Sequence, residues 1–410
     1  MSSGKFVVVD LCVSPRRAVA FVRLALAAAT SVIVVAPLIG APANAAVFGR
    51  DDRQPVPKGL KQLSQQIGRL YNPSIGTNCT AFCVAPNVIA TAAHCLFRKP
   101  KSGTLRMSDF RFAVGTGAAA RQSPIDGAAV KSAGQHIITG TTRLRVRPPI
   151  DAGSDWALMR TQDNICAGHE LPVHVKSMRE IERASDRGDM FQVAYHSDYD
   201  DWELAYSHPC KVRAEFPELS ARTIRRDFKN VRNLILHQCD TKGASSGSPM
   251  LERTPNGPVV VGINVGTYIQ SKVLIRNGQV ARKFEARPVA NTGINAAVFA
   301  DFIPLLSKAD ILTSRDDIRA IQRRLQADDH YRGPLDGVYG ANTRRSILAF
   351  QRAAGLARTG IPTRDLLDEG ERQAPPLPAR SPRSETRSLA TEALGTLETD
   401  GIARLLQAIE

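Results

Sequence analysis

The sequence has few aromatic residues and lacks several patterns that mark other classes of protein. Aromatic residues are 6% of its 410 residues and no basic segment is interleaved with them, so no nucleic-acid-binding module is expected despite a net charge of +15. No second cysteine pair accompanies Cys79 and Cys83 at the spacing of a zinc site, and we expect neither a metal nor another cofactor. An apolar content of 43% is still enough for one large core and one small one, hence for two or three domains.

The chain also lacks a clear membrane-spanning run near its N-terminus. The apolar stretch Leu24–Ile39 is shorter than the roughly 20 residues that a spanning helix needs, and it contains Pro37. Paired arginines precede it, and Ala43–Ala45 (Ala-Asn-Ala) has the small-x-small pattern of a signal-peptidase site. Residues 1–45 are therefore predicted to be a signal peptide that is cleaved after Ala45, by either the general or the twin-arginine export route. No membrane span is expected to remain after cleavage.

Export changes how the cysteines are interpreted, because disulfides form in oxidising compartments. Of the seven cysteines, Cys12 leaves with the predicted signal peptide, and the number that remains is even, as a set of disulfides requires. Cys210 and Cys239 bracket the strand that leads into a glycine- and serine-rich loop, so these two are expected to pair. The mature protein is accordingly predicted to reside in a periplasm, at a cell wall or outside the cell.

The part of the chain that follows the signal peptide consists of short apolar or alternating runs. Gly, Pro, Asn and Asp separate these runs, which is typical of an all-β sandwich or barrel. The expected strands are Phe82–Ala90, Phe110–Val114, Trp156–Arg160, Met190–Ala194, Leu234–His237, Val259–Gly266 and Gly293–Phe299. A helix near Ala300–Ser307 is expected to close this region.

The loop Cys239–Pro249 (Cys-Asp-Thr-Lys-Gly-Ala-Ser-Ser-Gly-Ser-Pro) carries a candidate nucleophile, Ser246. A serine hydroxyl is a poor nucleophile at neutral pH, so it needs an adjacent base and backbone N–H groups that face the developing oxyanion. Gly243 and Gly247 suit such a turn, because glycine permits unusual dihedrals and close approach of a substrate. The same residue types also make ordinary surface turns, so the loop alone does not establish a catalytic site.

Two upstream motifs supply the partners that such a serine needs. Thr91–Cys95 (Thr-Ala-Ala-His-Cys) follows the apolar run Val88–Ala90, which places His94 at the end of a buried strand. Asp155 lies in the string Gly153–Met159 (Gly-Ser-Asp-Trp-Ala-Leu-Met), directly before another strand-like run. Histidine, aspartate and serine thus occur in the order of the chymotrypsin-like peptidases.

Together the three motifs resemble the trypsin-like serine peptidase family over about residues 55 to 308. The Gly-Ser-Pro ending of the loop is similar to that of the bacterial glutamyl-endopeptidase-like branch. The resemblance implies an all-β, chymotrypsin-like fold of two six-stranded antiparallel barrels with the active site between them. It also implies hydrolysis of peptide bonds through an acyl-enzyme, with a protein or a peptide as the substrate.

The resemblance assigns a role to each matching residue. His94 would act as general base and later as general acid, Asp155 would orient it, and Ser246 would attack the scissile carbonyl. The backbone amides of Ala244 and Ser246 would form the oxyanion hole. A disulfide behind the catalytic histidine is also implied. The expected pairs are then Cys79–Cys95 from the resemblance, Cys210–Cys239 from their position, and Cys83–Cys166 from the two cysteines that remain.

The resemblance also indicates a primary substrate pocket, whose expected lining is Thr241, Asn264, Val265 and Gly266. The glutamyl-endopeptidase-like branch has a threonine five residues before the nucleophile, as here, but it has a histidine where this chain has Asn264. Glutamate preference is therefore not carried over. Asp240 lies near the basic-residue selector of trypsins, although an aspartate that is buried or makes a turn is the commoner case. Val261–Thr267 is expected to be the strand edge that pairs with the substrate backbone.

Two departures from the family bear on activity. Ser245 replaces the acid that in animal trypsins pairs with a freshly cut N-terminus, so activation by that route is not expected. Ala244 stands where a glycine is usual, and its methyl group disfavours the backbone conformation that an oxyanion loop requires. A catalytically weak or inactive envelope binding protein that keeps the peptidase fold is therefore the alternative to an enzyme.

Beyond residue 308 the apolar spacing changes from that of strands to that of helices. Ser314 can cap a first helix, with Asp317 completing a capping-box-like pair. A second helix is expected from Asn342 to Gly355, and a third, short one at Pro362–Glu369. The sequence therefore predicts a compact all-α unit of three helices.

This unit resembles the peptidoglycan-binding type 1 domain over residues 313–370. The resemblance rests on turn and core residues that agree in order, among them Gly333–Gly340 (Gly-Pro-Leu-Asp-Gly-Val-Tyr-Gly) and the pair Phe350-Gln351. It implies peptidoglycan as a partner. Asp336 and Tyr339 are candidate wall contacts, with a turn-shaping Asp and a core Tyr as the alternative.

The expected domains are residues 1–45, the signal peptide; 46–308, the trypsin-like peptidase; 309–372, the peptidoglycan-binding domain; 373–388, a Pro-rich linker; and 389–410, a helical tail. The sequence thus predicts an exported serine endopeptidase that its C-terminal module retains at the cell wall. Two alternatives stay open: the non-catalytic binding protein, and a wall-processing enzyme that acts on peptidoglycan cross-bridge peptides.

Overall fold

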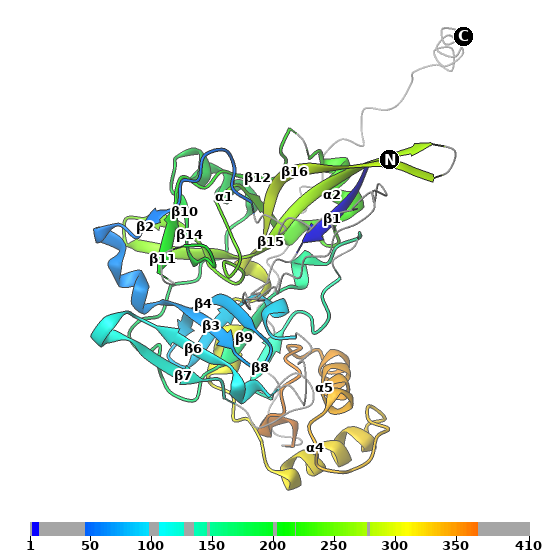
Figure 1. Cartoon of the computed structure of the whole chain (residues 1–410). Coiled ribbons are helices and arrows are strands. Elements are labelled where there is room, and N and C mark those ends of the chain that lie inside the picture. The colour runs from blue at the N-terminus through cyan, green and yellow to red at the C-terminus, as the bar shows by residue number, and fades with distance from the viewer. Residues whose placement is uncertain are drawn as a thin grey trace, which may run out of the picture. The chain divides into compact units, whose positions relative to one another are not determined.

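The computed structural model of the chain describes residues 2–7, 46–97, 106–126, 135–145, 148–199, 203–217, 219–276 and 279–367. The predicted Pro-rich linker and helical tail, and most of the predicted signal peptide, lie outside the described residues. The described part consists of two curled antiparallel sheets and a small helical unit (Figure 1). Within it, no helix is both long and apolar enough to cross a membrane.

The first sheet has seven strands in the order β7-β6-β3-β4-β5-β9-β8, and neighbouring strands are antiparallel. Its strands are β3 (Ile67–Asn72), β4 (Thr77–Ala85), β5 (Val88–Thr91), β6 (Arg111–Val114), β7 (Arg121–Pro124), β8 (Ile137–Thr139) and β9 (Ala157–Arg160). The single strand expected over Phe82–Ala90 is wrong, because Pro86 and Asn87 turn the chain between β4 and β5.

The second sheet has nine strands, in the order β12-β13-β16-β15-β14-β10-β11-β2, with β1 paired to β15 off this path. Its strands are β1 (Ser2–Val7), β2 (Gln54–Pro55), β10 (Met190–Tyr195), β11 (Leu204–Ser207), β12 (Val212–Arg213), β13 (Leu234–His237), β14 (Pro249–Thr254), β15 (Gly257–Arg276) and β16 (Gln279–Asn295). Strands β15 and β16 continue past the others as a long hairpin (Figure 1).

These two curled sheets form a chymotrypsin-like double barrel, as the sequence predicts. The sheets have seven and nine strands instead of six each. In the nine-stranded sheet, the two-residue strands β12 and β2 form the two ends of the order, and β1 pairs with β15 off this path. The helices of this region are α1 (Met178–Asp186), α2 (Ala221–Asp227) and α3 (Phe302–Ser307), the last close to the expected closing helix. The 3₁₀ helices are Lys58–Gln65, Ala93–Cys95, Met107–Asp109, Gly117–Ala119, Ala152–Ser154, Val231–Asn233 and Ala296–Val298.

Apolar side chains from both sheets pack into one large core. Among its largest fully buried side chains are Phe82, Phe112, Phe191, Tyr268 and Phe299. Strands β4, β5 and β9 are buried along almost their whole length. Because close-packed interiors resist displacement, residues at the ends of these strands are held in fixed positions.

The C-terminal unit has its own small core around Ile318, Ile321 and Ile347. Its helices are α4 (Arg315–Ala327) and α5 (Ala341–Ala353). The Ser314 hydroxyl oxygen accepts the Asp317 amide at 3.0 Å, so the predicted cap is present. The expected third helix is instead a 3₁₀ turn, Arg364–Leu366, within the described residues.

Candidate active site

Strand pairing brings His94 and Asp155 together. Strands β5 and β9 pair so that Thr91 lies opposite Ala157, and the two residues of interest lie just beyond these strand ends. The His94 ring nitrogen Nδ1 lies 2.7 Å from Asp155 Oδ2, and the His94 amide donates to Asp155 Oδ1 at 2.8 Å. Asp155 is fully buried. Both of its oxygens therefore bind one residue, which fixes the orientation of the imidazole.

The loop that carries Ser246 packs against the strands that lead to His94. The Thr80 amide of β4 donates to the Ser246 carbonyl at 2.9 Å, and Ser246 is 7% exposed. Gly247 has a φ of +85°, and a Cβ there would lie 2.2 Å from Thr91 Oγ1 and 2.3 Å from the Thr80 carbonyl oxygen. Only glycine permits this approach. The loop that carries Ser246 and the strands β4 and β5 thus meet at a contact that has no room for a side chain.

Ala244 adopts the left-handed backbone conformation, with φ at +76°. Hydrogen bonds hold the peptide groups around it: the Ser197 amide donates to the Gly243 carbonyl at 2.7 Å, and Thr80 Oγ1 donates to the Ala244 carbonyl at 2.8 Å. Within the described part of the chain, no hydrogen bond has the amide of Ala244 or of Ser246 as its donor.

The expected pocket residues lie around this loop, but most of them are covered. Thr241, Asn264 and Val265 are at most 2% exposed. The Asn264 amide Nδ2 donates to the Ser245 carbonyl at 3.0 Å, and its Oδ1 lies 3.1 Å from His237 Nε2. The Asn264 side chain therefore links the residue before Ser246 to a buried histidine.

His237 belongs to this linkage and had no expected function. Burial lowers its pKa to about 4, so the ring is neutral at pH 7. The Cys239 amide donates to Nδ1 at 3.3 Å, which leaves the ring proton on Nε2 to bind Asn264 Oδ1. A chain of hydrogen bonds thus runs from β13 through His237 and Asn264 to Ser245.

Asp240 is buried, with 2% of its surface exposed. Its two carboxylate oxygens accept the backbone amides of Phe48 and Asp52, each at 2.8 Å. The Thr241 amide donates to the Ala46 carbonyl at 2.9 Å. Asp240 therefore anchors the segment 46–53, and the buried, structural alternative fits it better than a selector at the bottom of a pocket.

The strand edge expected at Val261–Thr267 is shorter than predicted. Strand β15 pairs with β14 as far as Ile263, and β1 occupies the same strand from Thr267 onward. Asn264 is also bonded, since its amide donates to the Ser248 carbonyl at 2.9 Å. Among the described strands, the open edge on this side of β15 is Val265 and Gly266 in the uncleaved chain. Because β1 lies within the predicted signal peptide, cleavage after Ala45 would open this edge from Thr267 onward as well.

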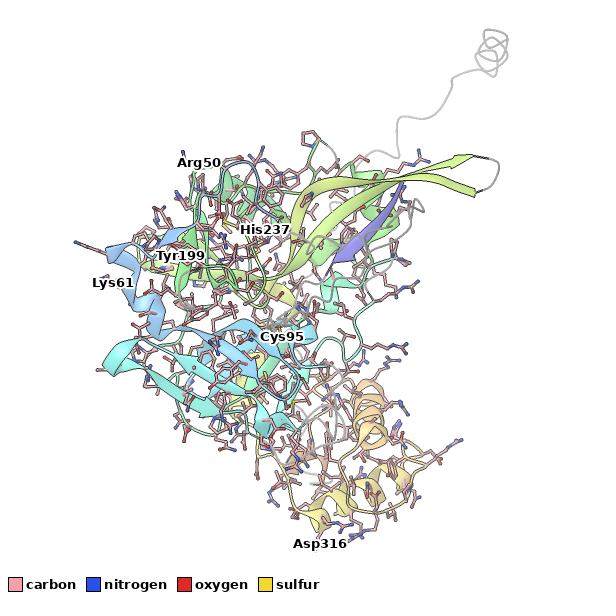
Figure 2. The ribbon with its side chains drawn as sticks, viewed as in Figure 1. Arg50, Lys61, Cys95, Tyr199, His237 and Asp316 are labelled. Atoms are coloured by element: carbon pink, nitrogen blue, oxygen red, sulfur yellow. A yellow bond between two sulfur atoms is a disulfide. The ribbon has the colours of Figure 1, made fainter. Side chains whose placement is uncertain are left out.

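The three disulfides have the expected pairing: Cys79–Cys95, Cys83–Cys166 and Cys210–Cys239. Cys95, labelled in Figure 2, directly follows His94 and ties its short helix to β4. In the described part of the chain, the one group of side chains close enough to hold a metal is Cys79, His94 and Cys95. Its two sulfurs are bonded to each other and are not free thiolates.

In the helical unit, Asp336 and Tyr339 have internal partners. Asp336 Oδ1 accepts the Gln322 side-chain amide and the Val338 backbone amide, each at 2.9 Å, and these bonds lower its pKa. The Tyr339 hydroxyl donates to the Gly360 carbonyl at 2.6 Å, and its residue is 4% exposed. The turn-shaping and core roles account for both residues.

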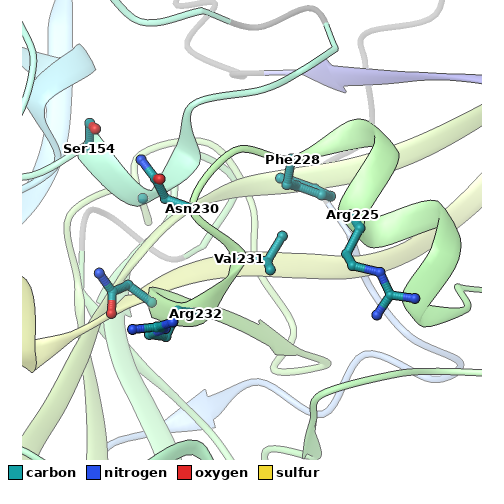
Figure 3. Close-up of a pocket in the computed structure, with 8 residues that line it drawn as sticks. Ser154, Arg225, Phe228, Asn230, Val231 and Arg232 are labelled. Atoms are coloured by element: carbon teal, nitrogen blue, oxygen red, sulfur yellow. The ribbon is translucent and has the colours of Figure 1, made fainter.

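A cavity of about 730 Å³ lies beside the turn that precedes Asp155 (Figure 3). Its lining is Gly153, Ser154, Arg225, Phe228, Asn230, Val231, Arg232 and Asn233. A bridge between Ile150 and Phe228 brings the two lining segments together. Both lining arginines are exposed, and neither forms an ion pair within the described residues. The cavity is therefore positively charged.

Comparison with known proteins gives two matches of different extent. Residues 314–369 match the family model described as "Putative peptidoglycan binding domain". A solved structure of a Glu endopeptidase in complex with MPD is 18% identical, with a TM-score of 0.41, over 63% of this chain and 98% of that one. No curated protein sequence matches the chain.

Proposed function

We propose that this chain is an exported serine endopeptidase that hydrolyses peptide bonds through His94, Asp155 and Ser246. The observation that carries the proposal is the two-point binding of His94 by buried Asp155, next to a serine loop with two unused backbone amides. This set combines a base, its orienting acid, a nucleophile and donors for an oxyanion.

The mechanism follows from the hydrogen bonds of His94. Asp155 Oδ2 accepts the Nδ1 proton, which leaves Nε2 to take the proton of the Ser246 hydroxyl. Ser246 Oγ bonds to the scissile carbonyl carbon, and the amides of Ala244 and Ser246 bind the oxygen that becomes negative. His94 then gives its proton to the amine as the carbon–nitrogen bond breaks, which leaves the acyl-enzyme. A water molecule then attacks the acyl carbon, with His94 again as the base, and Ser246 is released from the product.

The alternative, an inactive binding protein, rests on Ala244. Its methyl group makes the left-handed conformation unfavourable by about 1 kcal/mol. Ala244 nevertheless adopts this conformation, with a φ of +76°, and its amide donates to no acceptor among the described residues. This observation supports the enzyme over the inactive alternative.

We further propose that the C-terminal unit retains the enzyme at the cell wall. The family match of residues 314–369 supports peptidoglycan as the partner, and three disulfides fit a periplasmic or extracellular location. The proposed domains are residues 1–45, 46–308, 309–372, 373–388 and 389–410, with the roles predicted above. Cleavage after Ala45 would release the mature chain.

The proposal is tested on the mature chain, residues 46–410, with denatured proteins and isolated wall peptides offered in one reaction. New amino termini, identified by mass spectrometry, are expected with the wild type and not with Ser246→Ala. Cuts confined to wall peptides would favour the wall-processing alternative. Sedimentation with purified peptidoglycan is expected for both proteins, and a chain that stays in solution would contradict retention at the wall.

A further inference from the structure

The oxyanion loop needs a support that differs from that of animal trypsins, because Ser245 is not an acid. The turn 196–199, which follows β10, provides contacts to this loop. The Lys242 amide donates to His196 Nδ1 at 3.1 Å, and the Ser197 amide donates to the Gly243 carbonyl at 2.7 Å. His196 is 2% exposed, so this contact is internal.

The bond to Gly243 determines where the next amide points. The peptide between Gly243 and Ala244 is not among the cis bonds of the described residues. In a trans peptide the carbonyl and the N–H point in opposite directions. The Gly243 carbonyl faces the turn 196–199, so the Ala244 N–H faces away from it. A loop released from Ser197 would be free to rotate this peptide and withdraw the amide.

Arg53 holds the turn 196–199 from the N-terminal segment. Its Nη1 and Nη2 donate to the two Asp198 carboxylate oxygens at 2.8 and 3.0 Å. The same guanidinium binds Asp51, with a shortest distance of 2.6 Å, and lies 5.8 Å from the centre of the Tyr199 ring. Only 5% of the Arg53 side chain is exposed. A planar, two-point ion pair of this kind fixes orientation as well as position.

The same N-terminal segment also binds the other end of the loop. Asp240 accepts the amides of Phe48 and Asp52, and Thr241 donates to Ala46. Residues 46–53 therefore hold the run 240–243 at its start through Asp240 and at its end through Arg53 and Asp198. The left-handed conformation of Ala244, which a side chain disfavours, lies directly after this run.

We propose that Arg53 is a positioning residue: through Asp198 it keeps Ser197 bonded to Gly243, and so keeps the Ala244 amide turned into the oxyanion hole. The inference rests on the proposed function, because it concerns the same oxyanion hole. In animal trypsins an acid at the position of Ser245 supports the oxyanion loop. In this chain, the Arg53 side chain and the Asp198 carboxylate provide that support. A single side chain of the segment that follows the predicted cleavage site thereby supports the oxyanion hole through Asp198 and Ser197.

The test compares Arg53→Gln with Arg50→Gln in the mature chain. Arg50, labelled in Figure 2, is exposed in the same segment and forms no ion pair or side-chain hydrogen bond within the described residues. Asp198→Asn is the second variant; Asp198 is 43% exposed, so this change is well tolerated by the fold. For each protein, kcat and KM are measured with a peptide substrate, together with the affinity for a peptide boronic acid, whose adduct needs the oxyanion hole. Thermal unfolding controls for folding.

We expect Arg53→Gln and Asp198→Asn to lower kcat by about tenfold or more with KM nearly unchanged, since one oxyanion donor contributes about 10² to 10³ in kcat. Boronic acid affinity should fall in parallel, and Arg50→Gln should match the wild type. Equal kcat values for folded Arg53→Gln, Asp198→Asn and Arg50→Gln would overturn the inference and leave the proposed function intact. A wild type that neither cleaves peptides nor binds the boronic acid would instead show that the proposed function itself is wrong.

Discussion

Strands position His94 and Asp155, whereas a loop positions Ser246. On the first side, the paired ends of β5 and β9 set the geometry, and the interacting groups are buried in the core. On the second side, the run 240–247 has no regular secondary structure, and hydrogen bonds from Thr80, Ser197 and Asn264 hold it in place. We infer that the proposed base is fixed by the fold, and that the proposed nucleophile and oxyanion hole depend on individual side chains.

The largest effect should come from the strand side. Asp155→Asn keeps the shape but replaces one acceptor oxygen with an amide, which favours the wrong tautomer of His94, and we expect kcat to fall by about 10⁴. Asp151→Asn is the matched control, because Asp151 lies in the same turn and binds Ser154 Oγ instead of His94. Steady-state kinetics on a peptide substrate measure both. Equal kcat values for the two variants would contradict the assignment of Asp155.

The next largest effect should come from the contact of Gly247 with Thr80 and Thr91, where the two sides meet. Gly247→Ala places a methyl group against Thr91 and Thr80, whereas at Gly168 a Cβ would find nothing within 4 Å. Both glycines have positive φ, at +85° and +75°, so Gly168→Ala isolates the backbone cost. We expect a loss of about 1 kcal/mol in the free energy of unfolding for Gly168→Ala, and about 3 kcal/mol for Gly247→Ala. Denaturant unfolding measures both losses. Similar losses for the two variants would show that Gly247 does not lie so close to Thr80 and Thr91.

Acid should loosen the loop side through His237. Folded His237 stays neutral down to about pH 4, whereas the unfolded residue gains a proton near its ordinary pKa of 6.5. Between these values the unfolded state binds more protons, so the free energy of unfolding falls as the pH falls, by about 2 kcal/mol from pH 7 to 4.5. His237→Gln should remove this part of the decrease. His174→Gln is the control, because His174 is exposed. If His237→Gln leaves the decrease in the free energy of unfolding unchanged, the His237 ring is not buried in its neutral form.

The smallest effect concerns Ala244. Ala244→Gly relieves the left-handed strain, and we expect the free energy of unfolding to rise by about 0.5 kcal/mol without loss of kcat. Ala120 has a φ of −66°, so Ala120→Gly should instead lower the free energy of unfolding. Denaturant unfolding of the two variants gives the comparison. A loss of stability for Ala244→Gly as large as that for Ala120→Gly would contradict the strained conformation.

The same contrast explains what the sequence could predict. The positions of His94 and Asp155 follow from short motifs at the ends of strands, where local pattern and tertiary structure agree. The hydrogen bonds that hold the loop 240–247 do not follow from such motifs. Asp240 binds Phe48, 192 residues away, and Thr80 binds Ala244, 164 residues away, and no periodicity connects such positions. The role of Arg53 had no local signal, because its partner Asp198 is far along the chain.

Burial gives some of the predicted site residues a role other than the one expected from the sequence. Asn264 was expected to face a substrate, but its amide groups bind His237 and Ser245. His237 itself carried no spacing that indicated a function. A single sequence shows which residues are polar, but it does not show which of them the fold buries against one another.

Labelling with a fluorophosphonate serine probe shows whether His94 activates Ser246. The mature chain, residues 46–410, is compared with Ser246→Ala and His94→Ala, and the modified residue is located by mass spectrometry. We expect stoichiometric labelling at Ser246 in the wild type and none in either variant. If the probe does not label the folded, fully oxidised wild type, or labels it at another serine, His94 does not activate Ser246.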